Sequence, residues 1–431
     1  MKQKIYKRKR IIPVGWKEIK LGDVFRTSSG STPLSTEKSY YEGGVIPWIN
    51  SGELASPYIY KTSNYITQKG FENSSTELYP KDTVLVAMYG ATAGKASLLK
   101  LEACTNQAIC AILPNEDYCP EFIKYNIDTL YEHLVGLSSG SARDNLSQAG
   151  LKELKLVLPK TKKEQEKLVS VLSLLDRKIE LNRQINDNLE AMAKQLYDYW
   201  FVQFDFPNEE GKPYKSSGGA MVWNDKLKRE IPEGWYAENI CKIANILSGG
   251  TPSKAVDEYW NNGTIPFFGP TDCNGSVFQI KTADHITQKG LEHCASSLFE
   301  EGIVIITARG SIGKLVIVGT PMAMNQSCYA LQSKEGEYEY LYFLTTQLID
   351  CLKAKGSGSV FKSIIASDIE HSALCIATDN VVSDFCKKVK PMFEKLKANT
   401  IEIAELTKQR DELLLLLMNG QVSVNYHLSD D

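Results

Sequence analysis

Residues 163–201 carry a long series of apolar and amide side chains whose spacing alternates between three and four, and no proline interrupts it. The series consists of Leu168, Leu172, Leu175, Ile179, Asn182, Asn186, Leu189, Ala193, Leu196 and Trp200. This spacing predicts a helix with one apolar stripe, about 54 Å long at the usual rise of an α-helix. Such a helix is longer than a small domain is wide, so we expect a partner helix along most of it; the alternative is a long core helix of one globular domain.

A stretch with the same pattern occurs in the same chain, between Lys387 and Asn419. Its series consists of Val389, Phe393, Leu396, Thr400, Ile403, Leu406, Arg410, Leu413 and Leu417. Asn399 lies in this stretch at about the place that Asn182 has in the first, and a polar residue in an apolar seam fixes helix register at a cost in stability. Asn419 and Gly420 form a typical helix stop. We therefore predict two long helices that pair with each other.

The composition is ordinary for a soluble protein, with 43% of the 431 residues hydrophobic and 23% charged. The length predicts two to three domains. No basic segment followed by an apolar run marks a secretory signal, and the apolar run Leu413–Met418 is too short to cross a bilayer, so we expect no membrane partner.

The 10 cysteines are scattered, without a C-x-x-C pair or a histidine cluster. We therefore expect no zinc site and a reducing, cytoplasmic location.

The charge is unevenly distributed along the chain. The net charge is −3, but residues 1–160 hold 20 Lys and Arg against 16 Asp and Glu, whereas residues 207–380 hold 15 against 20. If both halves bind DNA, local basic patches must do so against an unhelpful average field. The basic stretch Lys2–Arg10 is either a solvated tail or an arm that contacts phosphates.

An internal repeat with a period near 219 residues organises the whole chain. Short motifs return in the same order, and the matched pairs are Ile12–Trp16 with Ile231–Trp235, Ser29–Pro33 with Gly249–Ser253, Ile46–Trp48 with Ile265–Phe267, Ile66–Gly70 with Ile286–Gly290, Gly90–Lys95 with Arg309–Lys314, Asn106-Gln107 with Asn325-Gln326, and Ser139–Ser141 with Ser357–Ser359. Chance does not produce so many matches in one order. The chain is therefore a duplicated unit, in which a globular module precedes each long helix.

Each module is predicted to be of the α+β class, with curled sheets and long functional loops instead of a doubly wound sheet. The expected strands are 83–88, 96–99, 303–307 and 315–318, which form hairpins across the Gly-Lys turns, and the expected helices are 120–135 and 339–353. The predicted organisation is a first module in 1–158, a long helix in 159–206, a linker in 207–230, a second module in 231–380, a second long helix in 381–420 and a tail in 421–431.

The turns Gly90–Lys95 and Arg309–Lys314 resemble a phosphate-binding loop of nucleotide-binding proteins only at first sight. The glycines of the first are one residue too close together, and the residue after each lysine is Ala or Leu where such a loop needs Ser or Thr to hold magnesium. We therefore expect no nucleotide site. Two interpretations stay open: a tight hairpin turn, or a turn whose Lys95, or Arg309 and Lys314, face DNA phosphate.

The sequence contains no recognisable catalytic motif. It lacks the D-P-P-Y and N-P-P-F motifs of amino-methyltransferases and a nuclease-type acid pair with a following lysine. Its five histidines have no Ser or Cys nucleophile motif beside them. We therefore expect a chain without catalytic chemistry of its own.

A polar and aromatic loop follows the Ile-Pro motif in both copies. Its residues are Trp48, Asn50, Ser51 and Glu53 in the first copy, and Phe268, Thr271, Asp272 and Asn274 in the second. Amide, hydroxyl and carboxylate groups can read base edges in the major groove; the alternative is a loop that closes the core.

The Asn-Gln pairs are identical in both copies, which favours a shared structural or phosphate role, because two half-sites normally differ. Arg143 and Lys362 follow the Gly-Ser turns as candidates for phosphate contact.

Taken together, these features resemble the specificity (S) subunits of type I restriction–modification enzymes over essentially the whole chain. The resemblance rests on the two long helices and on the motifs at Ile12, Ile231, Gly249–Ser253, Ile286–Gly290, Gly310–Lys314 and Asn325-Gln326. It implies two target-recognition domains that each read one half of a bipartite, asymmetric site in double-stranded DNA. It also implies that the long helices pack antiparallel as a spacer.

The resemblance further implies partners and cofactors. Two methyltransferase (modification) subunits would dock on this chain and methylate adenine with S-adenosylmethionine, and restriction subunits with an ATP-driven motor would join them. This chain would bind no cofactor itself, since S-adenosylmethionine, ATP and Mg²⁺ belong to the other subunits. The net acidity motivates an alternative from another class: a coiled-coil scaffold or regulatory protein on the same duplicated frame that does not bind DNA.

The resemblance also assigns candidate residues. The candidate DNA contacts are Ser31, Thr32, Trp48, Asn50, Ser51, Glu53, Tyr89, Thr92, Lys95, Ser141 and Arg143 in the first module, and Thr251, Ser253, Lys254, Phe268, Thr271, Asp272, Arg309, Ser311, Lys314, Ser359 and Lys362 in the second. The residues expected to hold the spacer or its partners are Leu168, Leu172, Leu175, Ile179, Asn182, Leu189, Leu196, Phe393, Leu396, Asn399, Ile403, Leu406, Leu413 and Leu417.

Overall fold

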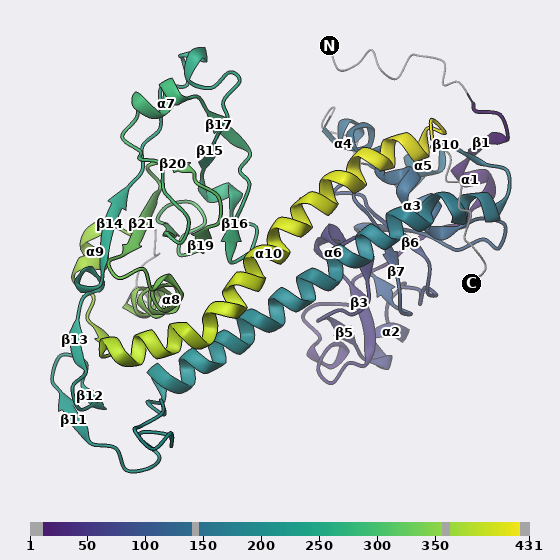
Figure 1. Ribbon diagram of the computed structural model, residues 1–431. Coiled ribbons are helices and arrows are strands. Elements are labelled where there is room, and N and C mark those ends of the chain that lie inside the picture. Colours follow the sequence, from purple (N-terminus) through teal and green to yellow (C-terminus); the bar gives the residue numbers. More distant parts are fainter. Residues whose placement is uncertain (1–11, 140–145, 356–362, 423–431) are drawn as a thin grey trace, which may run out of the picture. The chain divides into compact units, whose positions relative to one another are not determined.

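The computed structural model describes residues 12–139, 146–355 and 363–422 (Figure 1). Its contacts fall into two compact units. The first unit comprises the residues up to 178 together with those from 406 on, and the second unit comprises residues 179–405. Two long helices, α6 (Lys162–Tyr197) and α10 (Asp379–Met418), contribute a part to each unit.

The first unit contains a module of small sheets with short helices around them. Its strands are β1 (Trp16–Lys20), β2 (Thr27–Ser29), β3 (Ile46–Ile49), β4 (Tyr58–Ile59), β5 (Tyr65–Ile66), β6 (Val84–Ala87), β7 (Ala96–Leu99), β8 (Cys104–Thr105), β9 (Ile109–Ile112) and β10 (Lys155–Pro159). Its short helices are α1 (Leu21–Val24), η2 (Lys38–Tyr40), η3 (Ser51–Ala55), α2 (Gln68–Glu72), α3 (Pro120–Asp128), α4 (Tyr131–Ser139) and α5 (Gln148–Lys152). The strand orders are β2-β9-β6-β7-β4, β5-β3-β8 and β1-β10.

The second unit contains a module of the same kind. Its strands are β11 (Met221–Asn224), β12 (Arg229–Pro232), β13 (Tyr236–Glu238), β14 (Ala244–Ser248), β15 (Ile265–Phe268), β16 (Phe278–Gln279), β17 (Asp284–Ile286), β18 (Val304–Thr307), β19 (Leu315–Val318), β20 (Ala323–Met324), β21 (Cys328–Ser333) and β22 (Leu374–Ile376). Its helices are the π-helical turn η4 (Asp198–Val202), η5 (Ile240–Lys242), η6 (Asp257–Tyr259), η7 (Pro270–Asp272), α7 (Gln288–Glu292), α8 (Tyr338–Lys355) and α9 (Ala366–Glu370). The strand orders are β14-β21-β18-β19-β16, β17-β15-β20, β13-β22 and β11-β12.

The two modules have the same topology, strand for strand. The order β2-β9-β6-β7-β4 of the first returns as β14-β21-β18-β19-β16 in the second, and β5-β3-β8 returns as β17-β15-β20. Equivalent residues keep equivalent partners, since Trp48 lies opposite Cys104 and Phe267, one repeat period further on, lies opposite Ala323. The duplication and the α+β class that the sequence predicts are therefore confirmed.

The predicted hairpins are also confirmed. Val84 of β6 lies opposite Leu98 of β7 in an antiparallel pair, and Val304 of β18 lies opposite Ile317 of β19 in another. All eight residues of β6 and β7 are buried, as expected for strands that read as continuous apolar runs.

The single helix predicted for 120–135 is wrong, because α3 ends at Asp128 and α4 begins at Tyr131. The Thr129 hydroxyl between them donates to the backbone carbonyl of Asn126 at 2.7 Å. Such a local bond from a β-branched residue competes with the helix ladder and ends the helix there. The equivalent helix of the second unit, α8, runs unbroken from Tyr338 to Lys355.

In the first unit, α6 and α10 pack on the module through one apolar core. Leu172 has no exposed surface, and Leu168 and Leu417 belong to the same buried cluster. The predicted series of seam residues lacks Asp176, which is 1% exposed, and includes its neighbour Leu175, which is only half-buried. One position of the buried helix seam is therefore occupied by a carboxylate.

In the second unit, the same two helices meet through buried amides. Nδ2 of Asn399 donates to Oδ1 of Asn186 at 2.9 Å, and Nδ2 of Asn182 donates to a carboxylate oxygen of Glu402 at 2.8 Å. As the residue number rises along α6, the partner's number falls along α10, so the helices run antiparallel. The predicted pairing, with polar residues in the seam, is confirmed.

The residues after α6, which the sequence suggests as a linker, form a compact loop. Asp205 accepts hydrogen bonds from the backbone N–H and the hydroxyl of Ser216, at 2.7 and 2.6 Å. The ring of Phe206 stacks on Tyr214 and on Trp235, with centroids 4.6 and 5.1 Å apart. The hairpin of β11 and β12 follows, so the second module is attached to the end of α6 by packed structure.

Candidate nucleic-acid interface

Loops that are far apart in the sequence meet at one edge of the first module. We call them the first loop cluster, and they are residues 30–34, 50–53, 88–95 and 106–107. The first and third follow β2 and β6, whose carboxyl ends share an edge because both strands pair antiparallel with β9 between them. The indole N–H of Trp48 donates to the carbonyl of Ser31 at 3.0 Å, and the hydroxyl of Thr32 donates to Oε1 of Gln107 at 2.5 Å.

Two more side-chain bonds tie the remaining loops of this cluster together. Nδ2 of Asn106 donates to Oδ1 of Asn50 at 3.3 Å. The hydroxyl of Thr92, in the turn between β6 and β7, donates to the carbonyl of Ser51 at 2.7 Å. The structure thus joins four separately predicted polar segments into one surface.

The second module repeats this arrangement in a second loop cluster, which consists of residues 249–254, 269–272, 308–314 and 325–326. The hydroxyl of Thr251 donates to Oε1 of Gln326, as Thr32 does to Gln107 in the first cluster. A Cβ atom placed on Gly310 would lie 3.7 Å from Pro270, so the β18–β19 turn packs against η7.

The candidate carboxylates hold the backbone of these loops. Glu53 accepts a bond from the N–H of Asn50 at 2.9 Å and another from the amide of Asn64 at 3.1 Å. Asp272 accepts bonds from the N–H groups of Gly269 and Ala283, both at 2.8 Å. Each carboxylate therefore caps a short helix and fixes the following loop, which is the usual role of an acid in a capping position.

The Asn residues that are identical in both copies are also engaged with their own backbone. Oδ1 of Asn106 accepts from the N–H of Ala108 at 3.1 Å, and Oδ1 of Asn325 accepts from the N–H of Ser327 at 2.9 Å. These bonds form Asx turns. They therefore favour a structural role for the identical Asn-Gln pairs over a role in phosphate contact.

The identical Ile-Thr-Gln-Lys-Gly motif is a helix start in each module. The hydroxyls of Thr67 and Thr287 accept from the N–H groups of Gly70 and Gly290, each at 3.1 Å. A Cβ atom on Gly70 would lie 2.6 Å from the carbonyl oxygen of Tyr40, so the glycine permits a close backbone approach. The motif is therefore identical in the two copies because both need this helix start and this close backbone contact.

Glycine is equally required where the first loop of each cluster leaves its strand. A Cβ atom on Gly30 would lie 1.8 Å from the carbonyl oxygen of Thr105. On Gly249, one would lie 2.3 Å from the carbonyl oxygen of Asn325. The Gly-x-Thr-Pro loops are thus pressed against the neighbouring loop backbone.

Three of the candidate contacts are buried. Trp48 and Thr92 are each 8% exposed and Phe268 has no exposed surface. Trp48 and Phe268 lie in the strands β3 and β15, just before the loops in which the sequence predicts them to face outward. Their side chains therefore pack beneath the loops and offer little or no surface to a ligand.

The other described candidates lie on the surface or are half-buried. They are Ser31, Thr32, Asn50, Ser51, Glu53, Tyr89 and Lys95 in the first cluster, and Thr251, Ser253, Lys254, Thr271, Asp272, Arg309, Ser311 and Lys314 in the second. The candidates Ser141, Arg143, Ser359 and Lys362 lie outside the described residues.

Both Gly-Lys turns are tight hairpin turns. The N–H of Ala87 donates to the carbonyl of Lys95, and the N–H of Thr307 donates to that of Lys314, each at 3.0 Å. Gly90 and Gly310 have φ of 87° and 78°, in the left-handed region that favours glycine. The hairpin interpretation is confirmed, and it leaves the lysine side chains free to act at the surface.

Sequence reasoning missed three exposed groups on the two modules. Tyr60 and Tyr65 are 53% and 40% exposed. Lys353 of α8 reaches the second cluster, where its ammonium lies 3.7 Å from the position that a Cβ atom would take on Gly313. None of them belongs to a repeated motif, so only the folded chain reveals their place.

Sequence reasoning also missed a buried ion-pair network in the first unit. The carboxylate of Asp176 accepts from the hydroxyl of Tyr125 at 2.6 Å and from the guanidinium of Arg410 at 2.9 Å. Lys124 pairs with Asp128 at 2.9 Å. Burial raises the pKa of Tyr125 and that of Asp128. A charged residue inside the heptad series at Asp176 is the signal that could have indicated this network.

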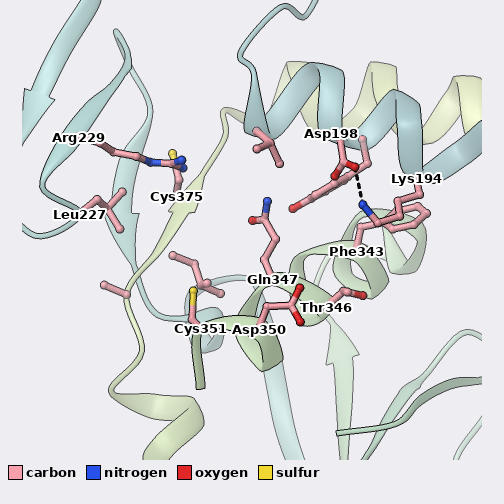
Figure 2. A pocket seen from close by; sticks show the side chains of 14 residues that line it. Lys194, Asp198, Leu227, Arg229, Phe343, Thr346, Gln347, Asp350, Cys351 and Cys375 are labelled. Carbon is pink, nitrogen blue, oxygen red and sulfur yellow. Dashed lines mark hydrogen bonds and ion pairs between the residues drawn. The ribbon is translucent and has the colours of Figure 1, made fainter. Parts of the chain in front are cut away.

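A pocket of about 440 Å³ lies in the second unit, and residues of α6, η4, β12, α8 and β22 line it. Figure 2 shows these side chains from close by. Lys194 and Asp198 form an ion pair at its edge, and Arg229 lies beside Cys375.

Across the described ranges, no group of three or more His, Cys, Asp or Glu side chains could hold a metal ion. Within the same ranges, no helix is both long and apolar enough to cross a membrane.

Comparisons with known proteins assign the family. The profile of the family described as "Type I restriction modification DNA specificity domain" matches residues 13–191 and 232–376, one range on each copy of the repeat. The specificity subunit of the type I restriction enzyme MjaIX of Methanocaldococcus jannaschii is 30% identical, over 96% of this chain and 95% of its own. That of the HindI enzyme of Haemophilus influenzae is 22% identical, over 94% of this chain and 99% of its own.

A solved structure has the same fold. The crystal structure of the S subunit of a type I restriction–modification system from M. genitalium aligns with a TM-score of 0.56 at 17% identity, over 95% of this chain and 97% of its own. The duplicated module, the paired helices and the sequence matches all point to one family. This chain therefore belongs to the specificity (S) subunits of type I restriction–modification enzymes, the non-catalytic subunits that recognise the DNA target.

Proposed function

We propose that each module reads one half of a bipartite, asymmetric DNA target through its loop cluster, and that the helix pair sets the distance between the halves. The observation that carries this proposal is the repetition of one topology with different exposed groups. The two clusters share their strands and their Thr–Gln bond. In the folded turns the left-handed Gly90 corresponds to Gly310, so Tyr89 stands in the first turn where Arg309 stands in the second. A common frame with different surface chemistry suits two unlike half-sites.

The corresponding division of the chain is part of the proposal. The recognition domains would be residues 1–158 and 231–380, the spacer helices 159–206 and 381–420, the linker 207–230 and the tail 421–431. The compact loop after α6, closed by Asp205 and Ser216, supports a firm attachment of the second domain to its helix.

The partners are proposed on the same basis. Two methyltransferase subunits would dock on the helices and recognition domains and methylate adenine with S-adenosylmethionine, and restriction subunits would add ATP- and Mg²⁺-dependent translocation and cleavage. Leu174, Leu181 and Met192 of α6 are 60%, 51% and 54% exposed. Their spacing places these three side chains on one face of the helix, which supports a docking role for these subunits.

The test begins with co-purification of the chain with a methyltransferase subunit, followed by sequencing of the methylated positions in the host genome. We expect one bipartite adenine motif. Replacing residues 12–158 by the equivalent module of another specificity subunit should change one half of the motif and leave the other intact. Methylation of a short continuous motif, or a change in both halves, would contradict the proposal.

A salt titration separates this proposal from the scaffold alternative. Neutralising phosphates releases counterions, so the affinity of the assembled complex for duplex DNA should fall linearly with salt concentration on logarithmic axes. A scaffold that does not bind DNA would show no binding to titrate.

A further inference from the structure

The second module presents an unpaired cluster of positive charge although its overall charge is negative. We call this cluster the basic turn, and it consists of Arg309 and Lys314 in the β18–β19 turn with Lys353 of α8 beside them. All three side chains are exposed. Among the described residues, none of them has a carboxylate at ion-pair distance.

Several other lysines of the second unit are already engaged. Lys289 pairs with Glu258, and Lys397 pairs with Glu301 at 2.5 Å. The ammonium of Lys281 donates to the carbonyl of Ala404 at 3.2 Å. Within the loop cluster, both carboxylate oxygens of Asp272 accept from backbone N–H groups. The cations of the basic turn therefore differ from these lysines in having no carboxylate partner among the described residues.

The backbone beneath the basic turn is firmly held. The N–H groups of Ala308 and Arg309 donate to the carbonyl of Ser327 at 2.8 and 3.2 Å. The hydroxyl of Thr307 accepts from the N–H of Lys314 at 2.9 Å. The N–H of Ile364 donates to the carbonyl of Ala308 at 2.9 Å. Cations on a fixed turn bind an anion without first ordering the backbone that carries them.

The equivalent turn of the first module differs at two of the three positions. Tyr89 stands in place of Arg309. A Cβ atom placed on Gly94 would lie 3.4 Å from the side chain of Tyr131 and 3.2 Å from that of Leu134, both in α4, whereas one on Gly313 would lie beside Lys353. Only the lysine at the end of the turn is kept, as Lys95. The first turn therefore carries one cation where the second carries three.

We propose that the basic turn is a phosphate clamp, which holds the DNA backbone beside the half-site that the second module reads. This inference rests on the proposed function. It explains how an acidic module can approach a polyanion: the repulsion of the average charge is offset by three exposed cations on one turn and the helix beside it. Phosphate contacts of this kind position a module on the duplex without carrying sequence information.

The experiment uses the full chain in complex with its methyltransferase subunits. A fluorescein-labelled duplex that contains the motif found by methylome sequencing, and a random-sequence duplex, are titrated over a range of salt concentrations. We expect the variant R309Q/K314Q/K353Q to lower the slope of log affinity against log salt by about 2 to 3 on both duplexes, because each lost contact removes about 0.9. The methylated motif should stay the same.

Matched controls keep the proposal falsifiable. Lys226, Lys242 and Lys395 are exposed lysines of the second unit outside the cluster, and K226Q/K242Q/K395Q, which removes the same number of charges, should leave the slope unchanged. Thermal melting of each variant verifies that it folds. An unchanged slope for the triple variant overturns the clamp, and so does an altered motif, which would mean that the basic turn reads bases. If the unmodified complex itself shows no salt-dependent DNA binding, the proposed function fails instead.

Discussion

On α10, the guanidinium of Arg410 lies 2.9 Å from the carboxylate of Asp176 on α6, whose side chain has no exposed surface. The hydroxyl of Tyr125 donates to the same carboxylate, so a buried polar network joins the first module to its helices in addition to the apolar core. The second module packs aromatic rings against its helices. Phe393 of α10 packs edge-on against Phe343 of α8, with centroids 5.9 Å apart. The duplicated halves thus solve one packing problem with different chemistry.

We expect Asp176→Ala to lower the free energy of unfolding of the first unit by about 3 to 5 kcal/mol, because it leaves Arg410 partly buried without its partner. The double variant D176L/R410M should be far less damaged, since both charges are gone. Urea denaturation followed by circular dichroism measures both. Asp187→Ala, at an exposed carboxylate of α6, is the control and should be near neutral. Equal losses for the single and the double variant would contradict the pairing.

Truncation of the helix seam should depend strongly on position. Leu172→Ala should cost about 2 to 5 kcal/mol because the side chain has no exposed surface. Leu175→Ala should cost less, because Leu175 is only half-buried. Leu174→Ala, at a side chain that is 60% exposed, should change the urea midpoint little. Similar midpoints for all three variants would refute this description of the seam.

Adding one methyl group to the loop clusters should disturb DNA recognition. Gly30→Ala and Gly249→Ala place a Cβ atom 1.8 and 2.3 Å from backbone oxygen, so the Gly-x-Thr-Pro loop must move away. We expect each variant to weaken specific DNA binding of the complex at least tenfold. Gly136→Ala, at an exposed position of α4 outside both clusters, is the control, because nothing lies within 4 Å of its Cβ position. Normal affinity in both variants would mean that these loops do not support the contact surface.

One buried acid should make stability depend on pH. Burial raises the pKa of Glu339, which is 3% exposed, above its ordinary value of 4.5. The folded chain therefore binds this proton more tightly than the unfolded chain. The stabilisation is fully present below pH 4.5 and is lost as the pH rises through the folded-state pKa.

We accordingly expect Glu339→Gln to raise the urea midpoint at neutral pH. Its advantage over the unmodified chain should shrink as the pH falls and vanish below the ordinary pKa. Midpoints measured across this pH range test the sign. A variant that is less stable than the unmodified chain at neutral pH would show that the Glu339 carboxylate is held by a favourable partner.

Much of the fold could be predicted because local patterns and the repeat agree. The buried runs of β6 and β18, the paired helices and the stop at Gly420 each follow from residue type and spacing. Asp176 could not be predicted as a seam residue, since its burial depends on Tyr125 and Arg410, which are distant in sequence. The break after Asp128 was missed because Thr129 interrupts an otherwise helical pattern through one local bond.

The candidate site was predicted less completely. The loops that form the clusters were found because the repeat marks them, but a shared motif does not tell a supporting residue from an exposed one. Trp48 and Phe268 occur in the marked segments and lie in the core. Lys353 occurs in no motif and lies at the surface of the second cluster, because α8 brings it there.

The loop that joins α6 to the second module has a consequence for how the chain can be cut. Its sequence is rich in glycine, lysine and polar residues, the composition at which proteases usually nick a chain. Asp205 and Ser216 close it, and the stacked rings of Phe206, Tyr214 and Trp235 hold it against the module. Trypsin would have to disrupt this aromatic packing before it could cleave after Lys215, so the halves of the polypeptide should resist separation by digestion.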